Sequence, residues 1–402
     1  MTTLSVVIPA MNEEEGIERI VRRVLAVKPE LMGVGLDDLE LVVVDDGSCD
    51  RTAEVVRRFP EVHLVCHPVN RGYGAALKTG FCESCGEWLA FLDADGTYPP
   101  ESLPQLYKAA VEHDADIVIG TRMAGSESRM PATRWIGNKL FAGLLSLVGN
   151  ARVTDSASGM RILRKDILRH LYPLPDGLHF TPAMSTRALH EQIKMIEVPI
   201  PYEERVGRSK LSVLRDGGRF FHIIMWTALS YNPVRILGML GLGNLALAGL
   251  IGIALVIARI QGITSLNPWG VLGVFATLVL AVSGVSVFAL GATFNYLVSL
   301  FHRRPVRHGL LGRPLFKAAL DYHFGWMGVL TAAIGGAMGL IIFTLGLNGW
   351  PVDRLWLYML GSAMMILVGL QLAISWLVMR ILEDLSRRET LASLDQAGNG
   401  SV

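Results

Sequence analysis

Residues Trp88–Pro100 read WLAFLDADGTYPP, an apolar run typical of a buried strand that ends in two carboxylates one residue apart. Side chains alternate along an extended chain, so Asp93 and Asp95 are expected to point to the same side. Two carboxylates that share a site repel each other unless a cation lies between them. Mg²⁺ and Mn²⁺ prefer oxygen ligands, and Mg²⁺ usually binds one or two carboxylates while water and substrate phosphates complete its shell. Asp93 and Asp95 are therefore the predicted metal ligands.

Similar β-rich runs recur through the first half of the chain and alternate with stretches of helical pattern. The predicted strands are LSVVIPA (4–10), LELVVVDDG (39–47), VHLVCH (62–67), WLAFLDAD (88–95) and DIVIGTR (116–122), and the predicted helices cover 13–27, 52–58, 73–82 and 101–113. Continuous Val, Ile and Leu strands separated by helices indicate a parallel sheet that is covered on both faces. The predicted fold class of this half is therefore α/β with a mostly parallel sheet.

Polar residues follow each of these strands at the point where it ends. They are Asn12 and Glu13, Asp45 and Asp46, Asn70 and Arg71, Asp93 and Asp95, and Thr121 and Arg122. Ligands of open parallel sheets bind outside the carboxyl ends of the strands, so these positions predict one shared pocket. Within this pocket, Asp93 and Asp95 suit a diphosphate clamp, and Asp46 could accept hydrogen bonds from the N–H edge of a nucleotide base.

The composition is too hydrophobic for an ordinary soluble protein. Of the 402 residues, 51% are hydrophobic and only 18% are charged, and the mean hydropathy is +0.40. Soluble domains average about 25% charged residues. The 37 Lys and Arg residues nearly equal the 36 Asp and Glu residues, so the net charge gives no indication of a nucleic-acid partner.

Four segments of the second half contain no Asp, Glu, Lys or Arg. They are Ile236–Ala258, Trp269–Leu300, Phe324–Leu347 and Leu355–Met379. Each exceeds the roughly 20 apolar residues that cross a bilayer as a helix. Buried helices of a large soluble core would not need four such long uncharged runs, so the sequence predicts four transmembrane helices.

The loops between these spans predict their orientation. The connection between the second and third spans carries five cations and one acid: Arg303, Arg304, Arg307, Arg313 and Lys317 against Asp321. By the positive-inside rule this loop is cytoplasmic, and with four spans both termini share its compartment. The predicted location is therefore the plasma membrane, with the first half of the chain and both termini in the cytoplasm. The four cysteines, all in that half, are not expected to form structural disulfides there.

Seven stretches of the first half, in this order, carry a resemblance to a known family. They are VVIPAMNEEEGI, LVVVDDGSCDRT, NRGYGAALKTGF, FLDADGTYPP, IGTR, DSASGMRIL and VPIPYEERVGRSKL. Together they resemble the family 2 glycosyltransferases of GT-A fold. Within that family they are most similar to the dolichol-phosphate mannosyltransferase-like, or polyprenyl-phosphate glycosyltransferase, group. The resemblance covers residues 4–215 and implies a Rossmann-like GT-A domain.

The resemblance also implies roles for individual residues. Pro9, Glu13, Val44 and Asp46 would bind the nucleotide, with Asp46 reading the base, and Asp93 and Asp95 would form the D-x-D metal site for Mg²⁺ or Mn²⁺. Arg122, Arg134, Arg205 and Lys210 would bind phosphate, and Asp95, Arg122 and Ser158 are the predicted catalytic residues. Three positions depart from the family pattern: Met11 replaces an aromatic, Thr97 replaces a Gln that helps to hold the metal, and Met184 lies where an acid is commoner.

The implied reaction moves a sugar from a UDP- or GDP-hexose to an undecaprenyl or dolichyl phosphate. A lipid phosphate is already an anion at neutral pH, so it needs no strong general base to attack the anomeric carbon. The site must instead neutralise the departing nucleoside diphosphate and align two anions that repel each other. Attack on the face opposite the leaving group would invert the anomeric centre.

Two other readings stay open. A membrane glycosyltransferase acting on another lipid or on a growing polysaccharide would share the fold, but the chain has neither a Q-x-x-R-W nor a T-E-D motif. A non-catalytic lipid-binding scaffold would share it too, although Asp93, Asp95 and Arg122 are all present.

The predicted organisation has four parts. A cytoplasmic GT-A domain (1–215) precedes a juxtamembrane interfacial helix (216–233), four transmembrane helices (234–380) and a cytoplasmic tail (381–402). The expected partners are the nucleotide sugar, the polyprenyl phosphate and the bilayer. The small residues of AAIGGAMG (332–339) are compatible with a homo-oligomer and with close packing of single helices.

Overall fold

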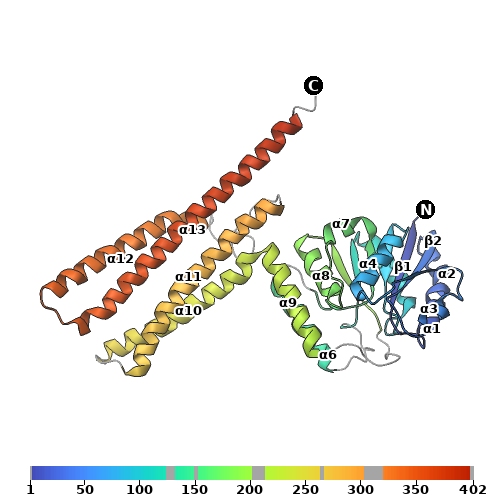
Figure 1. Cartoon of the computed structure of the whole chain (residues 1–402), viewed down its shortest axis with the longest axis horizontal. Helices are drawn as coiled ribbons and strands as arrows, with labels where there is room; N and C mark the ends of the chain where they lie inside the picture. The colour runs from blue at the N-terminus through green and yellow to red at the C-terminus, as the bar shows by residue number, and fades with distance from the viewer. Residues whose placement is uncertain are drawn as a thin grey trace. The chain divides into compact units, whose positions relative to one another are not determined.

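The computed structural model describes residues 2–123, 132–148, 153–201, 213–262, 267–302 and 320–398. The chain divides into two compact units, Met1–Ala228 and Leu229–Val402 (Figure 1). The first unit is α/β and the second contains four long apolar helices, so the predicted fold class is confirmed. The domain boundaries of the sequence analysis stay predictions.

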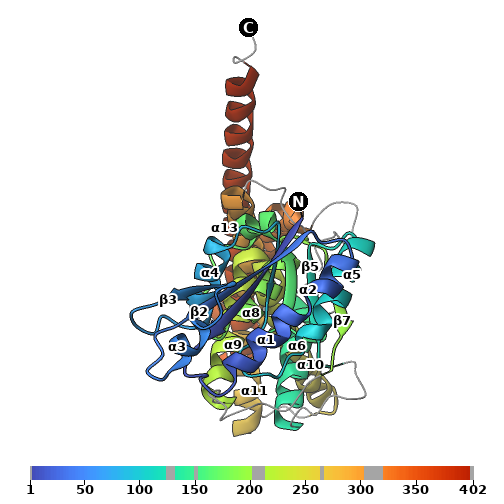
Figure 2. The ribbon, with the colours of Figure 1, turned by 90° about the vertical axis from the view of Figure 1, so that its right-hand side faces the viewer.

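The first unit contains a seven-stranded sheet with helices on both faces (Figure 2). Its strands are β1 (Thr3–Ala10), β2 (Asp38–Asp45), β3 (Val62–Cys66), β4 (Trp88–Phe91), β5 (Ile117–Thr121), β6 (Arg161–Arg164) and β7 (Met195–Pro199). Its α-helices are α1 (Ile17–Ala26), α2 (Lys28–Gly33), α3 (Thr52–Val56), α4 (Tyr73–Glu83), α5 (Leu103–Glu112), α6 (Ala132–Val148), α7 (Leu168–Leu171), α8 (Phe180–His190) and α9 (Val213–Tyr231).

The strands lie in the order β3-β2-β1-β4-β6-β5-β7, and six of the seven run in the same direction. Only β6 is antiparallel to its neighbours β4 and β5. The carboxyl ends of β1, β2, β4 and β5 therefore share one edge of the sheet, and β6 begins at that same edge. This arrangement brings the polar residues that follow each strand together.

Alternation along the strands builds two apolar layers. In β1, Leu4, Val6 and Ile8 face the layer that α1, α2 and α5 cover, and Val7 faces the layer that α4 and α8 cover. Side chains of successive strand residues point to opposite faces, so one Val- and Ile-rich strand fills both layers. The long apolar runs of the sequence follow from this double burial.

The five strands expected from the sequence are all present, and β6 and β7 were not predicted. Strand β6 has four residues, which is too short to show a period-2 pattern. Its neighbours in the sheet, β4 and β5, are remote from it in sequence. The helix expected from residue 13 begins only at Ile17, because residues 14–16 form a turn. Helix boundaries depend on such local turns more than on the apolar pattern.

The second unit consists of α10 (Pro233–Ile260), α11 (Pro268–His302), α12 (Phe324–Leu347) and α13 (Val352–Gly398). Each contains one of the four predicted spans and is long and apolar enough to cross a membrane. Helices α10 and α11 pack as one antiparallel pair, α12 and α13 pack as another, and α11 also contacts α13 (Figure 1).

Glycines bring the paired helices into close contact. A Cβ at Gly328 of α12 would lie 2.6 Å from the carbonyl oxygen of Gly369 in α13, and a Cβ at Gly335 would lie 2.9 Å from that of Ser362. Helix association in lipid depends on such packing because apolar burial gives no driving force there. Gly335 of AAIGGAMG thus packs against another helix of the same chain, while a Cβ at Gly336 would meet nothing within 4 Å.

The two kinds of glycine in α12 give a matched test of this packing. Gly328→Ala is expected to destabilise the second unit by about 1–3 kcal/mol, the usual cost of overpacking a close contact. Gly336→Ala is expected to be neutral or slightly stabilising, since alanine favours a helix and this site has room. Thermal unfolding of both variants in detergent checks this; equal loss of stability in the two would contradict the assignment.

Candidate active site

The two candidate metal ligands lie just beyond the end of β4. The strand stops at Phe91, and Asp95 lies in a turn, so its side chain is not placed by strand alternation. The hydroxyl of Tyr73 donates to Oδ1 of Asp93 at 2.8 Å. The backbone N–H and the hydroxyl of Thr97 both donate to Oδ1 of Asp95, at 3.1 and 2.6 Å. Thr97, one of the three departures noted in the sequence analysis, therefore orients one of the two candidate metal carboxylates.

A glycine gives Asp93 its position. A Cβ at Gly159 would lie 2.4 Å from Oδ2 of Asp93, closer than real Cβ contacts, so a side chain at position 159 would force the Asp93 carboxylate to shift. The N–H of Gly159 donates to the hydroxyl oxygen of Tyr98 at 2.7 Å. Tyr98 is 2% exposed, and burial raises the pKa of its phenol above the ordinary value, which keeps the phenol neutral.

This donor set fits a hard divalent cation. Two carboxylates separated by one residue lie at the carboxyl edge of the sheet, and Asp95 is 9% exposed. Among the residues that the structure describes, no third His, Cys, Asp or Glu joins them in a metal-binding group. Mg²⁺ and Mn²⁺ accept such an incomplete protein shell when phosphate oxygens and water supply the remaining ligands.

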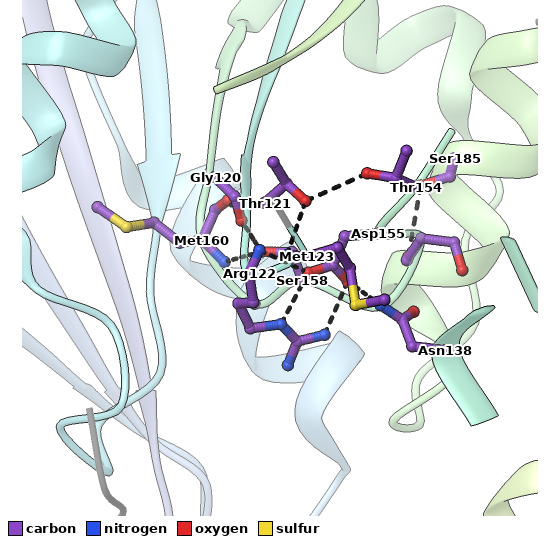
Figure 3. Close-up of polar contacts among 12 residues, drawn as sticks. Gly120, Thr121, Arg122, Met123, Asn138, Thr154, Asp155, Ser158, Met160 and Ser185 are labelled. Atoms are coloured by element: carbon purple, nitrogen blue, oxygen red, sulfur yellow. Dashed lines mark hydrogen bonds and ion pairs between the residues drawn. The ribbon is translucent and has the colours of Figure 1, made fainter. Parts of the chain in front are cut away.

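Arg122 follows β5 and forms a bidentate ion pair with Asp155 (Figure 3). Its Nε and Nη2 lie 2.8 and 2.7 Å from the two carboxylate oxygens, and its backbone N–H donates to Oδ2 of Asp155 at 3.0 Å. Nδ2 of Asn138, on α6, donates to Oδ1 of Asp155 at 2.9 Å. Arg122 is thereby held in one orientation at the carboxyl edge of the sheet, with its guanidinium 5.7 Å from the centre of the Tyr98 ring.

The charge of Asp155 depends on these contacts. Asp155 is 0% exposed, and burial alone would raise the pKa of its carboxyl group. The charge of Arg122 and the hydrogen bonds from Arg122 and Asn138 outweigh burial and hold that pKa below its ordinary value. Asp155 therefore stays ionised at neutral pH and keeps Arg122 paired.

Asp46, a predicted nucleotide contact, joins two loops. Its Oδ1 accepts the N–H of Arg71 at 2.9 Å and lies 2.7 Å from Nδ1 of His67, and its Oδ2 accepts the N–H of Gly72 at 2.8 Å. Gly72 has φ +102°, a conformation that side chains rarely adopt. Asp46 thus holds the loop between β3 and α4, and its role as a base reader stays a prediction.

The neighbouring Asp45 has a different environment. It is 5% exposed, and among the described residues its carboxylate accepts one hydrogen bond, from the N–H of Ser48 to Oδ1 at 3.2 Å. The hydroxyl of Ser48 accepts the N–H of Asn12 at 2.9 Å, which ties the loop after β1 to the loop after β2. Oδ2 of Asp45 therefore retains more capacity to accept a base N–H than either oxygen of Asp46.

Of the other predicted nucleotide contacts, Pro9 and Val44 lie on β1 and β2, and Glu13 follows β1. Pro9 and Val44 are register partners of β1 and β2, and Val44 is 0% exposed in the core, so a nucleotide could reach only its main chain. The N–H of Glu13 donates to the hydroxyl of Thr52 at 2.9 Å, which adds another link between the loops.

The remaining predicted site residues differ in their placement. The hydroxyl of Ser158 donates to the carbonyl of Gly120 at 2.6 Å and the residue is 0% exposed, so it connects a turn to β5. Met184 is also 0% exposed, in the core on α8. Arg134 belongs to α6, one turn before Asn138, but its side chain is outside the described part; Arg205 and Lys210 are outside it altogether.

The structure adds several residues that the sequence analysis did not place in the site. They are Tyr73, Tyr98, Asn138 and Asp155. Asp155 opens the stretch DSASGMRIL, which carried a usable signal: an acid and an arginine in an otherwise small and apolar run. Asn138 and the tyrosines gave no such signal, because nothing in the sequence distinguishes them from ordinary helix and turn residues.

Comparison with known proteins matches both units. Residues 5–172 match the glycosyl transferase family 2 model, and residues 233–393 match a domain of unknown function (DUF8752). A solved structure, glucosyl-3-phosphoglycerate synthase from Mycobacterium tuberculosis, aligns with a TM-score of 0.42 and 23% identity over 57% of this chain and 80% of that chain.

Two curated proteins illustrate the sequence relatives. The low-salt glycan biosynthesis hexosyltransferase Agl6 of Haloferax volcanii is 33% identical over 57% of this chain, but the match spans only 54% of that protein. The undecaprenyl-phosphate 4-deoxy-4-formamido-L-arabinose transferase of Enterobacter sp. is 30% identical over 306 residues, which are 74% of this chain and 89% of that protein. The chain therefore belongs to glycosyl transferase family 2, as a glycosyltransferase with four candidate membrane spans.

Proposed function

We propose that the chain transfers a hexose from a UDP- or GDP-sugar to a polyprenyl phosphate at the cytoplasmic face of the membrane. The reaction uses Mg²⁺ or Mn²⁺ and inverts the anomeric centre. The observation that carries the proposal is the meeting of a two-carboxylate site with a fixed arginine at one sheet edge. Asp93 and Asp95 supply the first, and Arg122, held by Asp155, supplies the second.

The carboxylates suit the donor half of the reaction. A divalent cation at Asp93 and Asp95 would neutralise charge on the departing nucleoside diphosphate. Tyr73 and Thr97 fix the two carboxylates before substrate arrives, so little reorganisation is needed when negative charge develops. The Asp45–Asp46 loop, Pro9, Val44 and Glu13 would hold the nucleotide on the adjacent strands, with a carboxylate of the Asp45–Asp46 pair accepting the base N–H.

The arginine suits the acceptor half. A guanidinium matches phosphate oxygens in geometry and charge, and Arg122 is 12% exposed in its side chain while its Nε–Nη2 edge is held by Asp155. We assign Arg122 to one of the phosphates, with Arg134, Arg205 and Lys210 as further phosphate ligands. Ser158 would act by holding the turn against β5. No group at this edge needs to act as a strong base, because a phosphate acceptor is already ionised.

The acceptor class is supported by the relatives and by the second unit. The Enterobacter relative is named for undecaprenyl phosphate, and it aligns over most of its length. Four apolar helices suit an enzyme whose acceptor is a membrane lipid.

A transfer assay tests the function directly. Purified protein in detergent would receive Mn²⁺ or Mg²⁺, undecaprenyl or dolichyl phosphate, and labelled UDP- or GDP-sugars in turn. We expect one donor to give an organic-extractable labelled lipid, and Asp95→Ala to lower the rate at least 100-fold because a metal ligand is lost. Label in diacylglycerol or in a growing glycan would refute the acceptor, and silence with every acceptor would favour a scaffold.

The Arg122–Asp155 pair predicts a second result. Asp155→Asn removes a charge-assisted hydrogen-bonded pair worth about 1.5–3 kcal/mol, so we expect kcat to fall roughly 10- to 100-fold. The matched control is Asp166→Asn, an exposed carboxylate paired with Arg164, which is expected to keep wild-type activity. An Asp155→Asn enzyme with wild-type kcat would show that the pair is dispensable.

The native cysteines can report the proposed orientation. Cys49, Cys66, Cys82 and Cys85 are all exposed and all belong to the first unit. A membrane-impermeant maleimide is expected to label them in inverted membrane vesicles and to leave them unlabelled in intact cells. Labelling in intact cells would place the first unit outside and overturn the cytoplasmic assignment.

A further inference from the structure

Arg161 is the largest fully buried side chain of the first unit, and neither its burial nor its charge is explained by the roles assigned above. It begins β6 and pairs in register with Phe91 of β4 and Ile119 of β5. It therefore lies beneath the strand ends that precede Asp93 and Arg122. Burying a cation costs several kcal/mol even after relaxation, so an arginine in this position must be compensated by specific contacts.

Its hydrogen bonds all go to one turn. Nε donates to the carbonyl of Ser158 at 3.2 Å, and Nη2 donates to the carbonyl of Ser156 at 2.8 Å. Among the described residues, Nη1 is buried without a hydrogen-bond partner, and no carboxylate forms an ion pair with Arg161. Burial lowers the pKa of the guanidinium to about 10, against the opposing charge of Asp155, so Arg161 is still a cation at neutral pH.

The turn that Arg161 holds contacts both halves of the site. At its start, Asp155 pairs with Arg122. At its end, Gly159 lies against Asp93 and is bonded to the hydroxyl of Tyr98. Between them, Ser158 bonds to Gly120 at the end of β5 (Figure 3). A shift of this turn would move the partner of Arg122 and the wall beside Asp93 together.

We propose that Arg161 is a positioning residue of the transfer site. Its buried guanidinium holds the carbonyls of Ser156 and Ser158, and so keeps Asp155 on Arg122 and Gly159 against Asp93. It touches neither substrate nor metal. The inference rests on the proposed function for its effect on transfer, but its effect on the metal site can be measured without turnover.

Mn²⁺ binding is the first readout. The full-length protein in detergent is titrated with Mn²⁺ alone, and free Mn²⁺ is followed by electron paramagnetic resonance. We expect Arg161→Met to weaken Mn²⁺ binding about tenfold, because the turn no longer fixes Gly159 beside Asp93. Arg164→Met is the matched control on the same strand: this arginine is exposed, and among the described residues its side chain pairs with Asp166 alone, so binding is expected to stay within twofold of wild type.

Two further variants keep the test decisive if Arg161→Met does not fold. Arg161→Lys keeps the charge but cannot span both carbonyls as a planar guanidinium does, and a threefold or greater loss of Mn²⁺ affinity is expected. Tyr98→Phe removes the acceptor of the Gly159 N–H at little change in volume and is expected to act in the same direction. Wild-type Mn²⁺ affinity in folded Arg161→Lys and Tyr98→Phe would overturn the proposal, even if their melting temperatures fell.

Transfer kinetics at saturating Mn²⁺ supply the second readout. Because Asp155 is also displaced, kcat of Arg161→Met is expected to stay at least tenfold below wild type after Mn²⁺ occupancy is restored. Recovery of full kcat would overturn the link to Arg122. If wild type itself transfers no sugar, the proposed function fails, while the Mn²⁺ titration still decides the role of Arg161.

Discussion

The antiparallel insertion of β6 is the constraint on which the site depends. Because β6 runs against β4 and β5, its first residue lies where its neighbours end, and the turn that precedes it passes along the carboxyl edge of the sheet. A parallel strand in this position would begin at the opposite edge, and no residue just before it could reach Asp93 or Arg122. Asp155, Gly159 and Arg161 enter the site through this one reversal of direction.

Breaking the ion pair that this turn forms costs more free energy than breaking a surface ion pair of the same domain. The exposed pair of Arg22 and Glu18 is screened by water and contributes at most about 1 kcal/mol. The pair of Arg122 and Asp155 excludes water from the carboxylate, so loss of one partner would leave a charge that nothing solvates. This edge of the site is therefore rigid, because hydration would not compensate for separating the two charges.

Much of this arrangement could be predicted from the sequence, because it follows from the common direction of the strands. Parallel strands send all their carboxyl ends to one edge, so residues directly after strands, such as Asp46, Asp93 and Arg122, could be assigned to one pocket from order alone. Residues that reach the pocket by other routes could not. Tyr73 begins a helix, Asn138 lies within one, and Arg161 begins a strand whose pairing partners are about 40 and 70 residues distant. The roles of individual residues were less predictable than their positions. Asp46 hydrogen-bonds to His67 and to two backbone N–H groups, and Ser158 hydrogen-bonds to a backbone carbonyl. A sequence motif does not indicate such contacts.

The contact between Gly159 and Asp93 couples two positions that are 66 residues apart in the chain. The carboxylate occupies the volume in which any side chain at position 159 would begin. A substitution at 159 would thus act sterically on the Asp93 carboxylate without altering any charge, and Asp93 would have to adopt another rotamer to relieve the contact. The orientation of the Asp93 carboxylate is thus coupled to the absence of a side chain at position 159. Glycine at 159 therefore belongs to the candidate metal site together with the carboxylate that it touches.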